Sequence, residues 1–247
     1  MVDYPRFSIA AYECRNGSSL PPRLPYLSDV LKPLSKSSDV GKSFSARYTI
    51  LALSYRGFWS SQGRPSQRGI EQDAAAAIDW TIGTYGSNGE HIKMVLWGQS
   101  IGAGVATTAA ARYPSSRRPR IPGLAISGLI LETPFTSVKD MLTTLYPQKW
   151  LPYRYLWPFL WNWWDSKQAL HSLGQSRARE SLSVLILQAG KDELVPTKHG
   201  MELEDLCKRN GIGVQRKEIA GALHTEVMAR AQGRRAVVSF LEDIGAG

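Results

Sequence analysis

The sequence predicts an α/β fold, in which a mostly parallel β-sheet is flanked by helices. The first observation is that short runs rich in β-branched residues alternate with longer segments of helical pattern, which is the order of strands joined by crossover helices. The second is that several of these runs are apolar at both odd and even positions, as expected for strands covered on both faces. We expect a single domain over residues 1–247.

Strands are expected where apolar, β-branched runs are bounded by polar or turn-forming residues. The first of these runs lies in an N-terminal stretch that is otherwise rich in Pro and Ser, and segments of helical pattern lie between later ones. The predicted strands are Phe7–Cys14, Tyr48–Ser54, Ile92–Trp97, Ser127–Leu131, Ser183–Gln188 and Gly213–Ile219.

Helices are predicted from their end signals as well as from their pattern. The hydroxyl of Ser66 can cap the first turn of one helix, an alanine-rich helix ends before Pro114, and Asn210-Gly211 is a good left-handed stop for another. The predicted helices are Gln67–Thr81, Ile101–Arg112, Thr197–Arg209 and Thr225–Leu241.

Two regions depart from this alternation of strands and helices. Residues 1–47 form an atypical N-terminal region with one predicted strand followed by a Pro- and Ser-rich stretch, in which Leu20–Pro25 is a plausible start of a helix. Residues 145–180 are aromatic at the start and polar afterwards. We expect this second region to be a cap insertion that lies over the sheet, and not a separate domain.

The composition excludes several classes of protein. Hydrophobic residues make up 43% of the 247 residues, which is too many for a disordered chain. Two cysteines, Cys14 and Cys207, exclude a disulfide scaffold. No uncharged apolar run approaches the roughly 20 residues of a membrane-spanning helix, and the N-terminus lacks the pattern of a signal peptide. We therefore expect an intracellular protein.

The chain is basic, because 30 Lys and Arg residues exceed 21 Asp and Glu residues and give a formal net charge of +9. These charges occur in short clusters such as Arg117-Arg118 and Arg234-Arg235. We interpret the clusters as solvated faces, with attraction to an anionic membrane surface as the next alternative. No motif accompanies the charge, so nucleic acid is not an expected partner.

The pentapeptide Gly98-Gln99-Ser100-Ile101-Gly102 fits the pattern G-x-S-x-G. Its context makes it informative, because a predicted strand precedes it and a predicted helix follows it. A sharp turn between these elements holds a serine in a strained conformation and requires small neighbours. The turn lifts the hydroxyl above the sheet at a helix N-terminus, which stabilises developing negative charge. Ser100 is therefore the candidate nucleophile.

A serine hydroxyl needs a base to take its proton. Of the four histidines, His91 precedes its strand and so lies at the wrong end of the sheet, His171 falls in the insertion, and His199 is expected on an exposed helix face. His224 follows the last predicted strand, at the same carboxyl edge as Ser100. We expect His224 to be the base.

The base in turn needs a carboxylate that orients its ring and stabilises the imidazolium. Asp192 follows the strand Ser183–Gln188, and Glu132 follows the strand Ser127–Leu131, so both acids are expected at the carboxyl edge. Asp192 is favoured because it lies nearer to His224 in the order of the chain. Glu132 is interpreted as a structural hydrogen-bonding residue.

These residues occur in the order serine, acid, histidine, and further motifs accompany them. With Trp97-Gly98-Gln99-Ser100-Ile101-Gly102, the chain resembles the α/β-hydrolase superfamily from about Tyr48 to Leu241. It is most similar to ABHD-type serine hydrolases, the branch of the bud-emergence-related proteins, lysophospholipid lipases and protein depalmitoylases. The other motifs are Tyr55-Arg56-Gly57-Phe58, Ser61-Gln62-Gly63-Arg64-Pro65-Ser66, Leu131-Glu132-Thr133-Pro134-Phe135 and Gly190-Lys191-Asp192-Glu193-Leu194-Val195-Pro196.

The resemblance implies an α/β-hydrolase fold with Ser100 as nucleophile, Asp192 as acid and His224 as base. It also implies that the backbone N–H of Ile101 is one donor of the oxyanion hole. The family's second donor comes from a loop containing a His-Gly pair, and the corresponding stretch here, Cys14-Arg15-Asn16-Gly17-Ser18, has none. The family's first strands and N-terminal membrane segment are also missing, so we expect a shortened N-terminus.

Five of the eight tryptophans lie in one stretch, from Trp150 to Trp164. Such rings can cover an acyl-chain groove, rest at the headgroup level of a membrane or form the packed core of a cap. Acyl binding and peripheral membrane contact are the favoured interpretations, and relatives in the resembling branch are associated with endomembranes. The tryptophans concerned are Trp150, Trp157, Trp161, Trp163 and Trp164.

The sequence thus predicts a serine hydrolase that cleaves carboxylic esters or thioesters of apolar acyl groups through an acyl-enzyme. The expected substrates are acyl esters, lysophospholipids or acylated proteins. No cofactor is expected, and no metal, because no metal-ligand spacing is present. The alternatives are a weak or inactive lipid-binding or scaffold protein and an aminopeptidase-like amide hydrolase. The sequence makes no prediction of the oligomeric state.

Overall fold

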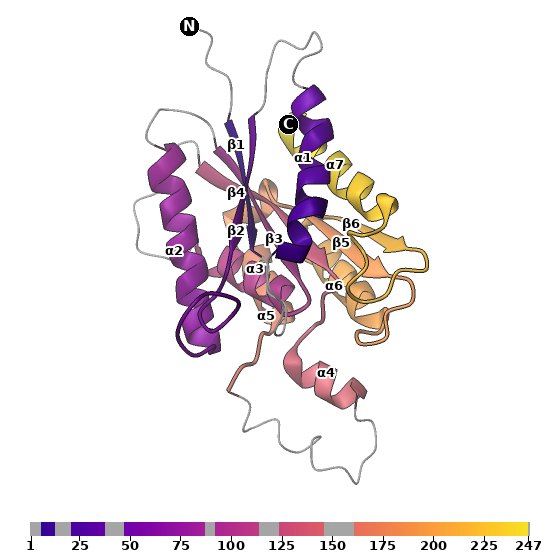
Figure 1. Ribbon diagram of the computed structural model, residues 1–247. Coiled ribbons are helices and arrows are strands. Elements are labelled where there is room, and N and C mark those ends of the chain that lie inside the picture. The colour runs from indigo at the N-terminus through magenta and orange to yellow at the C-terminus, as the bar shows by residue number, and fades with distance from the viewer. Residues whose placement is uncertain are drawn as a thin grey trace, which may run out of the picture.

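The structure of the chain is a computed structural model that describes residues 6–12, 21–37, 47–86, 92–113, 124–145 and 161–246. Within these ranges six strands form one parallel sheet in the order β2-β1-β3-β4-β5-β6 (Figure 1). The strands are β1 (Arg6–Tyr12), β2 (Arg47–Leu53), β3 (Ile92–Gln99), β4 (Leu124–Glu132), β5 (Ser183–Ala189) and β6 (Gly213–Ile219).

Helices cover both faces of this sheet. On one face α1 (Leu24–Ser37) and α7 (Ala231–Ala246) enclose a core that includes Val30, Val95 and Phe240. On the other face α2 (Gln67–Tyr85), α3 (Ile101–Arg112), α5 (Ser166–Gly174) and α6 (Lys198–Arg209) enclose a second core that includes Ile78, Leu129 and Leu203. A helix α4 (Val138–Leu145) and the 3-10 turns η1 (Pro21–Arg23) and η6 (Arg177–Glu180) complete the described elements.

The predicted α/β class and all six strand predictions are confirmed, with shifts of a few residues at strand ends. Two of the helix signals act as expected. Ser66 is the N-cap of α2 and its hydroxyl accepts a hydrogen bond from the N–H of Gly69 at 3.2 Å. Gly211 follows α6 with a φ of +68°, the left-handed conformation that stops a helix.

The last helix begins later than predicted. Residues 225–230 belong to the loop after β6, and α7 begins at Ala231. The reason is visible at Gly233, where an added Cβ would lie 2.1 Å from the backbone oxygen of Val227. The loop therefore folds back against the helix, and only a glycine at position 233 permits this close approach.

Of the cap insertion expected over residues 145–180, the structure describes residue 145 and residues 161–180. Helix α5 lies in the helical layer, where its side chains Leu170 and Leu173 are part of the hydrophobic core. Asp165 caps the helix by accepting from the N–H of Gln168 at 2.9 Å. Helix α5 is thus an amphipathic helix that directly follows the aromatic segment.

The tryptophans of this segment divide between core and surface. Trp164 is buried in the core, whereas Trp163 is partly exposed and Trp161 is 93% exposed. Trp150 and Trp157 lie outside the described residues.

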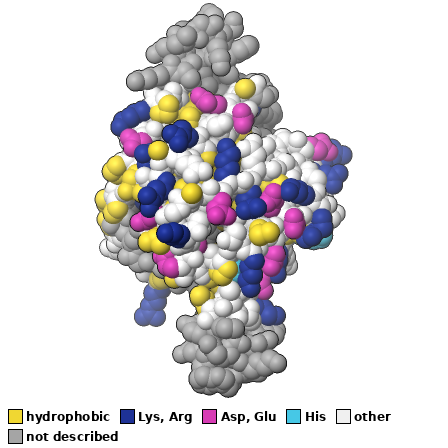
Figure 2. Space-filling view, turned by 90° about the vertical axis from the view of Figure 1, so that its right-hand side faces the viewer, with side chains coloured by type: hydrophobic (Ala, Val, Ile, Leu, Met, Phe, Trp, Pro, Cys, Tyr) yellow, Lys and Arg dark blue, Asp and Glu magenta, His cyan; other side chains and the backbone are white. Residues whose placement is uncertain are grey.

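Over the face shown in Figure 2, basic side chains are interspersed with acidic and hydrophobic ones, as expected for a solvated face.

Candidate active site

Ser100 is the single residue that connects strand β3 to helix α3. Strand β3 ends at Gln99 and α3 begins at Ile101, so Ser100 makes the whole turn, with φ of +54° and ψ of −115°. A non-glycine residue adopts this conformation at a cost and only when its surroundings hold it. The side chain is partly exposed. This is the strained turn that the G-x-S-x-G pattern predicts.

Close backbone packing explains the small residues around the turn. A Cβ added to Gly98 would lie 2.0 Å from the backbone oxygen of Gly102, which no side chain can tolerate. The turn is also held by hydrogen bonds, because the N–H of Ser100 donates to the oxygen of Glu132 at 2.9 Å. Strand β4 therefore supports the turn from the side.

Asp192 and His224 are brought together at the carboxyl edge of the sheet, on the loops that follow β5 and β6. His224 Nδ1 lies 3.0 Å from both Oδ1 and Oδ2 of Asp192, and both side chains are almost fully buried. An ionised carboxylate can only accept, so Nδ1 carries the proton and donates it. The other ring nitrogen, Nε2, is left with its lone pair, as a general base requires.

The pair is oriented from both sides. Asp192 Oδ1 accepts from the backbone N–H groups of Leu194 and Val195 at 2.9 and 2.7 Å, which holds the carboxylate in its own loop. The backbone N–H of His224 donates to Oε2 of the neighbouring Glu193 at 2.9 Å. Glu193 is a functional neighbour that the spacing of the motif did not reveal, because its partner is 31 positions away.

One hydrogen bond connects the histidine loop to the serine turn. The side-chain amide of Gln99 donates from Nε2 to the backbone oxygen of His224 at 3.1 Å, and both residues are buried. Among the described residues the hydrogen bonds of His224 involve Asp192, Glu193 and Gln99, and none joins its ring to the Ser100 hydroxyl.

The carboxylate of Glu132 binds residues other than a histidine. Its carboxylate is fully buried and binds Arg23, with 2.8 Å between Nη2 and Oε1, and it also accepts from Nε1 of Trp97. The interpretation of Glu132 as a structural hydrogen-bonding residue, and not as the partner of a catalytic histidine, is therefore confirmed.

The remaining histidines divide as follows. His91 lies outside the described residues, and His171 is exposed on α5. The expectation that His199 faces solvent is wrong, because it is 1% exposed in the first turn of α6 and its Nδ1 lies 2.9 Å from the hydroxyl of Thr136. Burial and the nearby charge of Lys198 lower its pKa, so the ring is held neutral.

Ile101 opens α3, so its backbone N–H is one of the first-turn groups that a helix cannot satisfy internally. The stretch Cys14–Ser18, expected near the second oxyanion donor, lies outside the described residues.

Cys207 is buried in the core and burial raises its pKa to about 12, which excludes it as a nucleophile near neutral pH. Among the described residues no cluster of His, Cys, Asp and Glu could hold a metal ion.

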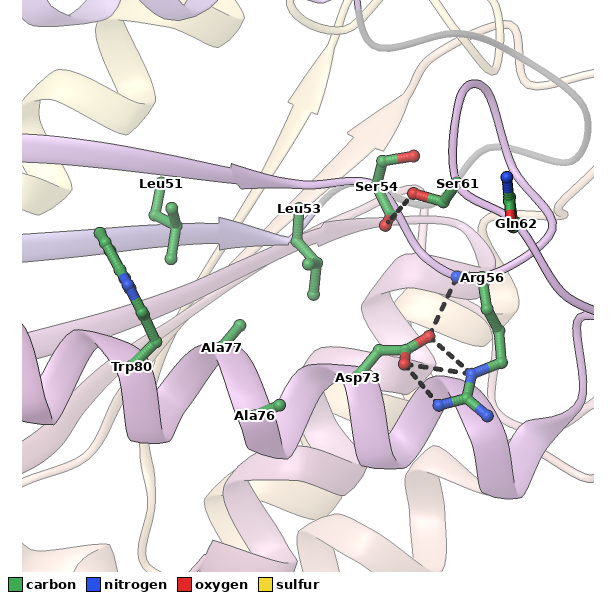
Figure 3. Close-up of a pocket in the computed structure, with 10 residues that line it drawn as sticks. All are labelled: Leu51, Leu53, Ser54, Arg56, Ser61, Gln62, Asp73, Ala76, Ala77 and Trp80. Atoms are coloured by element: carbon green, nitrogen blue, oxygen red, sulfur yellow. Dashed lines mark hydrogen bonds and ion pairs between the residues drawn. The ribbon is translucent and has the colours of Figure 1, made fainter.

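A surface hollow of about 430 Å³ lies between β2 and α2 (Figure 3) and contains none of the three predicted catalytic residues. Arg56 and Asp73 form an ion pair of 2.7 Å at one end of it, and Trp80 lies at the other end. Burial opposes ionisation of Asp73, but hydrogen bonds from Arg56 outweigh it and lower the pKa of that carboxyl. Within the described ranges no helix is long and apolar enough to span a bilayer.

Comparison with known proteins gives related sequences and related folds, although no protein-family model matches the chain. The protein Bem46 of Schizosaccharomyces pombe is 32% identical over 163 residues, which cover 64% of this chain and 46% of that protein. The lysophosphatidylserine lipase ABHD12 of Danio rerio is 32% identical over 169 residues, which cover 67% of this chain and 41% of that protein. The chain thus spans less than half the length of these curated relatives.

Solved structures match the chain over nearly its whole length. An esterase of Pyrococcus furiosus superposes with a TM-score of 0.64 and 15% identity, covering 96% of this chain and 81% of the esterase. The esterase Est1E of Butyrivibrio proteoclasticus, solved with ferulic acid bound, superposes with a TM-score of 0.62 and 15% identity, covering 99% and 91%. At this identity the likeness shows the fold alone.

Proposed function

We propose that this chain, a member of the α/β-hydrolase superfamily related in sequence to Bem46 and ABHD12, is a serine hydrolase of carboxylic esters or thioesters. The observation that carries the proposal is the pairing of two features at one sheet edge. Ser100 occupies a strained turn at the start of α3, and a buried Asp192–His224 pair lies on loops tied to that turn through Gln99.

In the proposed mechanism the hydroxyl oxygen of Ser100 attacks the acyl carbon while Nε2 of His224 takes its proton. Asp192 holds the opposite ring nitrogen and stabilises the imidazolium. The oxyanion that develops on the carbonyl oxygen accepts a hydrogen bond from the N–H of Ile101, at the positive end of α3. The tetrahedral intermediate collapses, and His224 returns the proton to the departing alcohol or thiol.

The second half of the reaction uses the same groups. A water molecule attacks the acyl-enzyme carbonyl while His224 accepts one of its protons, and the Ser100 oxygen leaves with that proton. The products are the carboxylic acid and free enzyme. Because the two steps are symmetrical about His224, a single base serves both.

An apolar acyl group is supported by the exposed side chains at the carboxyl edge. Trp59, Leu194 and Leu223 are 56%, 47% and 41% exposed, and they lie on the loops that follow β2, β5 and β6. In a parallel sheet all these loops share the edge that carries Ser100. The name of ABHD12, a lysophosphatidylserine lipase, makes a lysophospholipid the first substrate to test, followed by acylated proteins.

Labelling with a fluorophosphonate probe tests the activity directly. We expect the folded chain to be labelled and Ser100→Ala to remain unlabelled. A panel of acyl esters, acyl thioesters, lysophospholipids and aminoacyl amides then defines the substrate class. Preferential cleavage of the aminoacyl amides would favour the aminopeptidase-like alternative, and folded protein without Ser100-dependent labelling would favour a lipid-binding or scaffold role.

Peripheral membrane contact is proposed for the same edge. Tryptophan is favoured at the headgroup level, and the chain offers a matched pair of exposed tryptophans. Trp59 is 56% exposed at the carboxyl edge, and Trp80 is 53% exposed in the second half of α2, which runs back toward the other edge. We expect Trp59→Ser to weaken cosedimentation with phosphatidylserine-containing vesicles and Trp80→Ser to leave it unchanged. Equal binding by both variants and the parent chain would contradict contact through Trp59.

A further inference from the structure

Glu132 connects the N-terminal part of the chain to the serine turn. Its carboxylate accepts two hydrogen bonds from the Arg23 guanidinium, 2.8 Å from Nη2 to Oε1 and 3.3 Å from Nη1 to Oε2. Oε1 also accepts from Nε1 of Trp97, three residues before the serine. The backbone oxygen of the same residue accepts the N–H of Ser100 at 2.9 Å.

The burial of this cluster makes its geometry rigid. The side chains of Arg23 and Glu132 are 5% and 0% exposed, so solvent cannot replace a contact that is lost. A guanidinium that binds both oxygens of a carboxylate fixes its orientation, which a single-point cation such as an ammonium does not do. The carboxylate of Glu132 is therefore held in one position at the end of β4.

Two residues with strained backbone are attached to Glu132: Ser100 through a hydrogen bond and Thr133 through the peptide bond. Ser100 has a φ of +54°, and Thr133, directly after Glu132, has a φ of +42°. The N–H of Thr133 donates to the oxygen of Leu187 at 2.7 Å. Such conformations persist only where the surrounding structure holds them. Because the carbonyl that anchors Ser100 belongs to Glu132, a displaced carboxylate would loosen the turn.

We propose that Arg23 and Glu132 are positioning residues for the nucleophile. The pair holds the backbone of Glu132 so that the amides of Ser100 and Ile101 keep the orientation needed for attack and for oxyanion binding. The proposal assigns neither Arg23 nor Glu132 a contact with the substrate. This inference rests on the proposed serine hydrolase function and adds to it a residue from η1, more than 70 positions from the serine.

Arg23→Lys is the test variant, because it keeps the charge and removes the two-point contact. Arg56→Lys is the matched control, because Arg56 also binds a carboxylate through several hydrogen bonds, including one of 2.7 Å to Asp73 Oδ1. We expect Arg23→Lys to lower kcat on an acyl ester and the rate of fluorophosphonate labelling by at least about 10-fold, with KM within about twofold. Arg56→Lys is expected to leave kcat within about twofold.

A stabilising role alone would lower the free energy of unfolding of Arg23→Lys, more than that of Arg56→Lys because the Arg23 pair is more buried, and would leave kcat of the folded protein unchanged. If folded Arg23→Lys keeps kcat within about twofold of the parent chain, or loses no more than Arg56→Lys, the proposal is overturned. If Arg23→Lys does not fold, Glu132→Gln makes the same comparison, because its amide keeps an oxygen toward the guanidinium and loses the charge.

Hydrogen exchange distinguishes failure of this inference from failure of the proposed function. A parent chain without Ser100-dependent labelling would overturn the function, and exchange in a peptide covering residues 97–105 would still test the pair. We expect faster exchange there in Arg23→Lys than in Arg56→Lys. Equal exchange in the two variants would show that the pair does not hold the turn.

Discussion

Gln99 and His224 are joined by a buried hydrogen bond of 3.1 Å between a side-chain amide and a backbone oxygen. Gln99 is the residue directly before Ser100, and His224 is the histidine paired with Asp192. The bond therefore makes the position of His224, the proposed base, depend on that of the turn carrying Ser100, the proposed nucleophile, although 125 residues separate the two bonded residues.

Gln99→Met preserves the shape of the side chain and removes this hydrogen bond. We expect kcat on an acyl ester to fall by about 10- to 100-fold with little change in KM, because misplacement of the base affects the reacting atoms more than acyl binding. Steady-state kinetics with a circular dichroism check of folding measure this. Unchanged kcat in a folded variant would show that the histidine loop is positioned without Gln99.

Asp192→Asn should nearly abolish turnover, because an amide can favour the wrong tautomer of His224 and cannot stabilise an imidazolium. A loss of about 10³- to 10⁴-fold in kcat is expected. Glu193→Gln is the matched control, because within the described part of the chain Glu193 binds the backbone N–H of His224 at 2.9 Å and makes no hydrogen bond to its ring. Its expected loss is about 10-fold or less. Similar losses in the two variants would contradict the assignment of Asp192 as the acid.

Replacement by alanine is expected to have opposite effects on the free energy of unfolding at Gly98 and at Gly83. Gly98→Ala places a Cβ 2.0 Å from the backbone of Gly102, and we expect a loss of at least about 3 kcal/mol in the free energy of unfolding. Gly83 lies in α2 with open space around it, so Gly83→Ala should add up to about 1 kcal/mol. Urea denaturation measures both. A tolerated Gly98→Ala would contradict the close packing of the turn.

His199 should make stability depend on pH. Burial and the charge of Lys198 lower its pKa below the unfolded value of about 6.5, so the unfolded state binds a proton more readily. The stabilising contribution is therefore complete above about pH 6.5 and is lost as the pH falls below it, with a slope of up to about 1.4 kcal/mol per pH unit.

Urea unfolding of His199→Asn between pH 7.5 and 5 checks this dependence. We expect a flatter profile than that of the parent chain, because the variant has no ring to protonate. The exposed His171 provides the control, and His171→Asn should retain the slope of the parent chain. A parent profile that is already flat over this range would contradict a buried neutral His199.

The elements that the sequence predicted well are those with strong local signals. The strands are apolar on both alternations because helices cover both faces, and the turn at Ser100 is marked by glycines whose spacing follows from backbone contact. The carboxyl-edge positions of Asp192 and His224 followed from counting strands in a parallel sheet. Their contact at 3.0 Å agrees with that count.

The errors concern residues whose environment is made by distant parts of the chain. His199 has the sequence context of a surface helix, but Thr136, 63 positions away, covers it. Helix α5 was not predicted as a separate helix, since its burial depends on contact with the other helices of its layer. The last helix was predicted to begin at Thr225, but the loop at Val227 packs against Gly233 and the helix begins at Ala231.

By itself the sequence determined the six strands and four of the seven helices that the structure describes, the strained serine turn and the identity of the three candidate catalytic residues, because all of these depend on local pattern or on chain order. Only the tertiary structure decided that Gln99 binds the histidine loop and that Arg23 and Glu132 form a buried ion pair beside the serine turn. The physical reason is that a buried polar group must find a partner of the right geometry, and which distant residue provides it depends on how the chain packs.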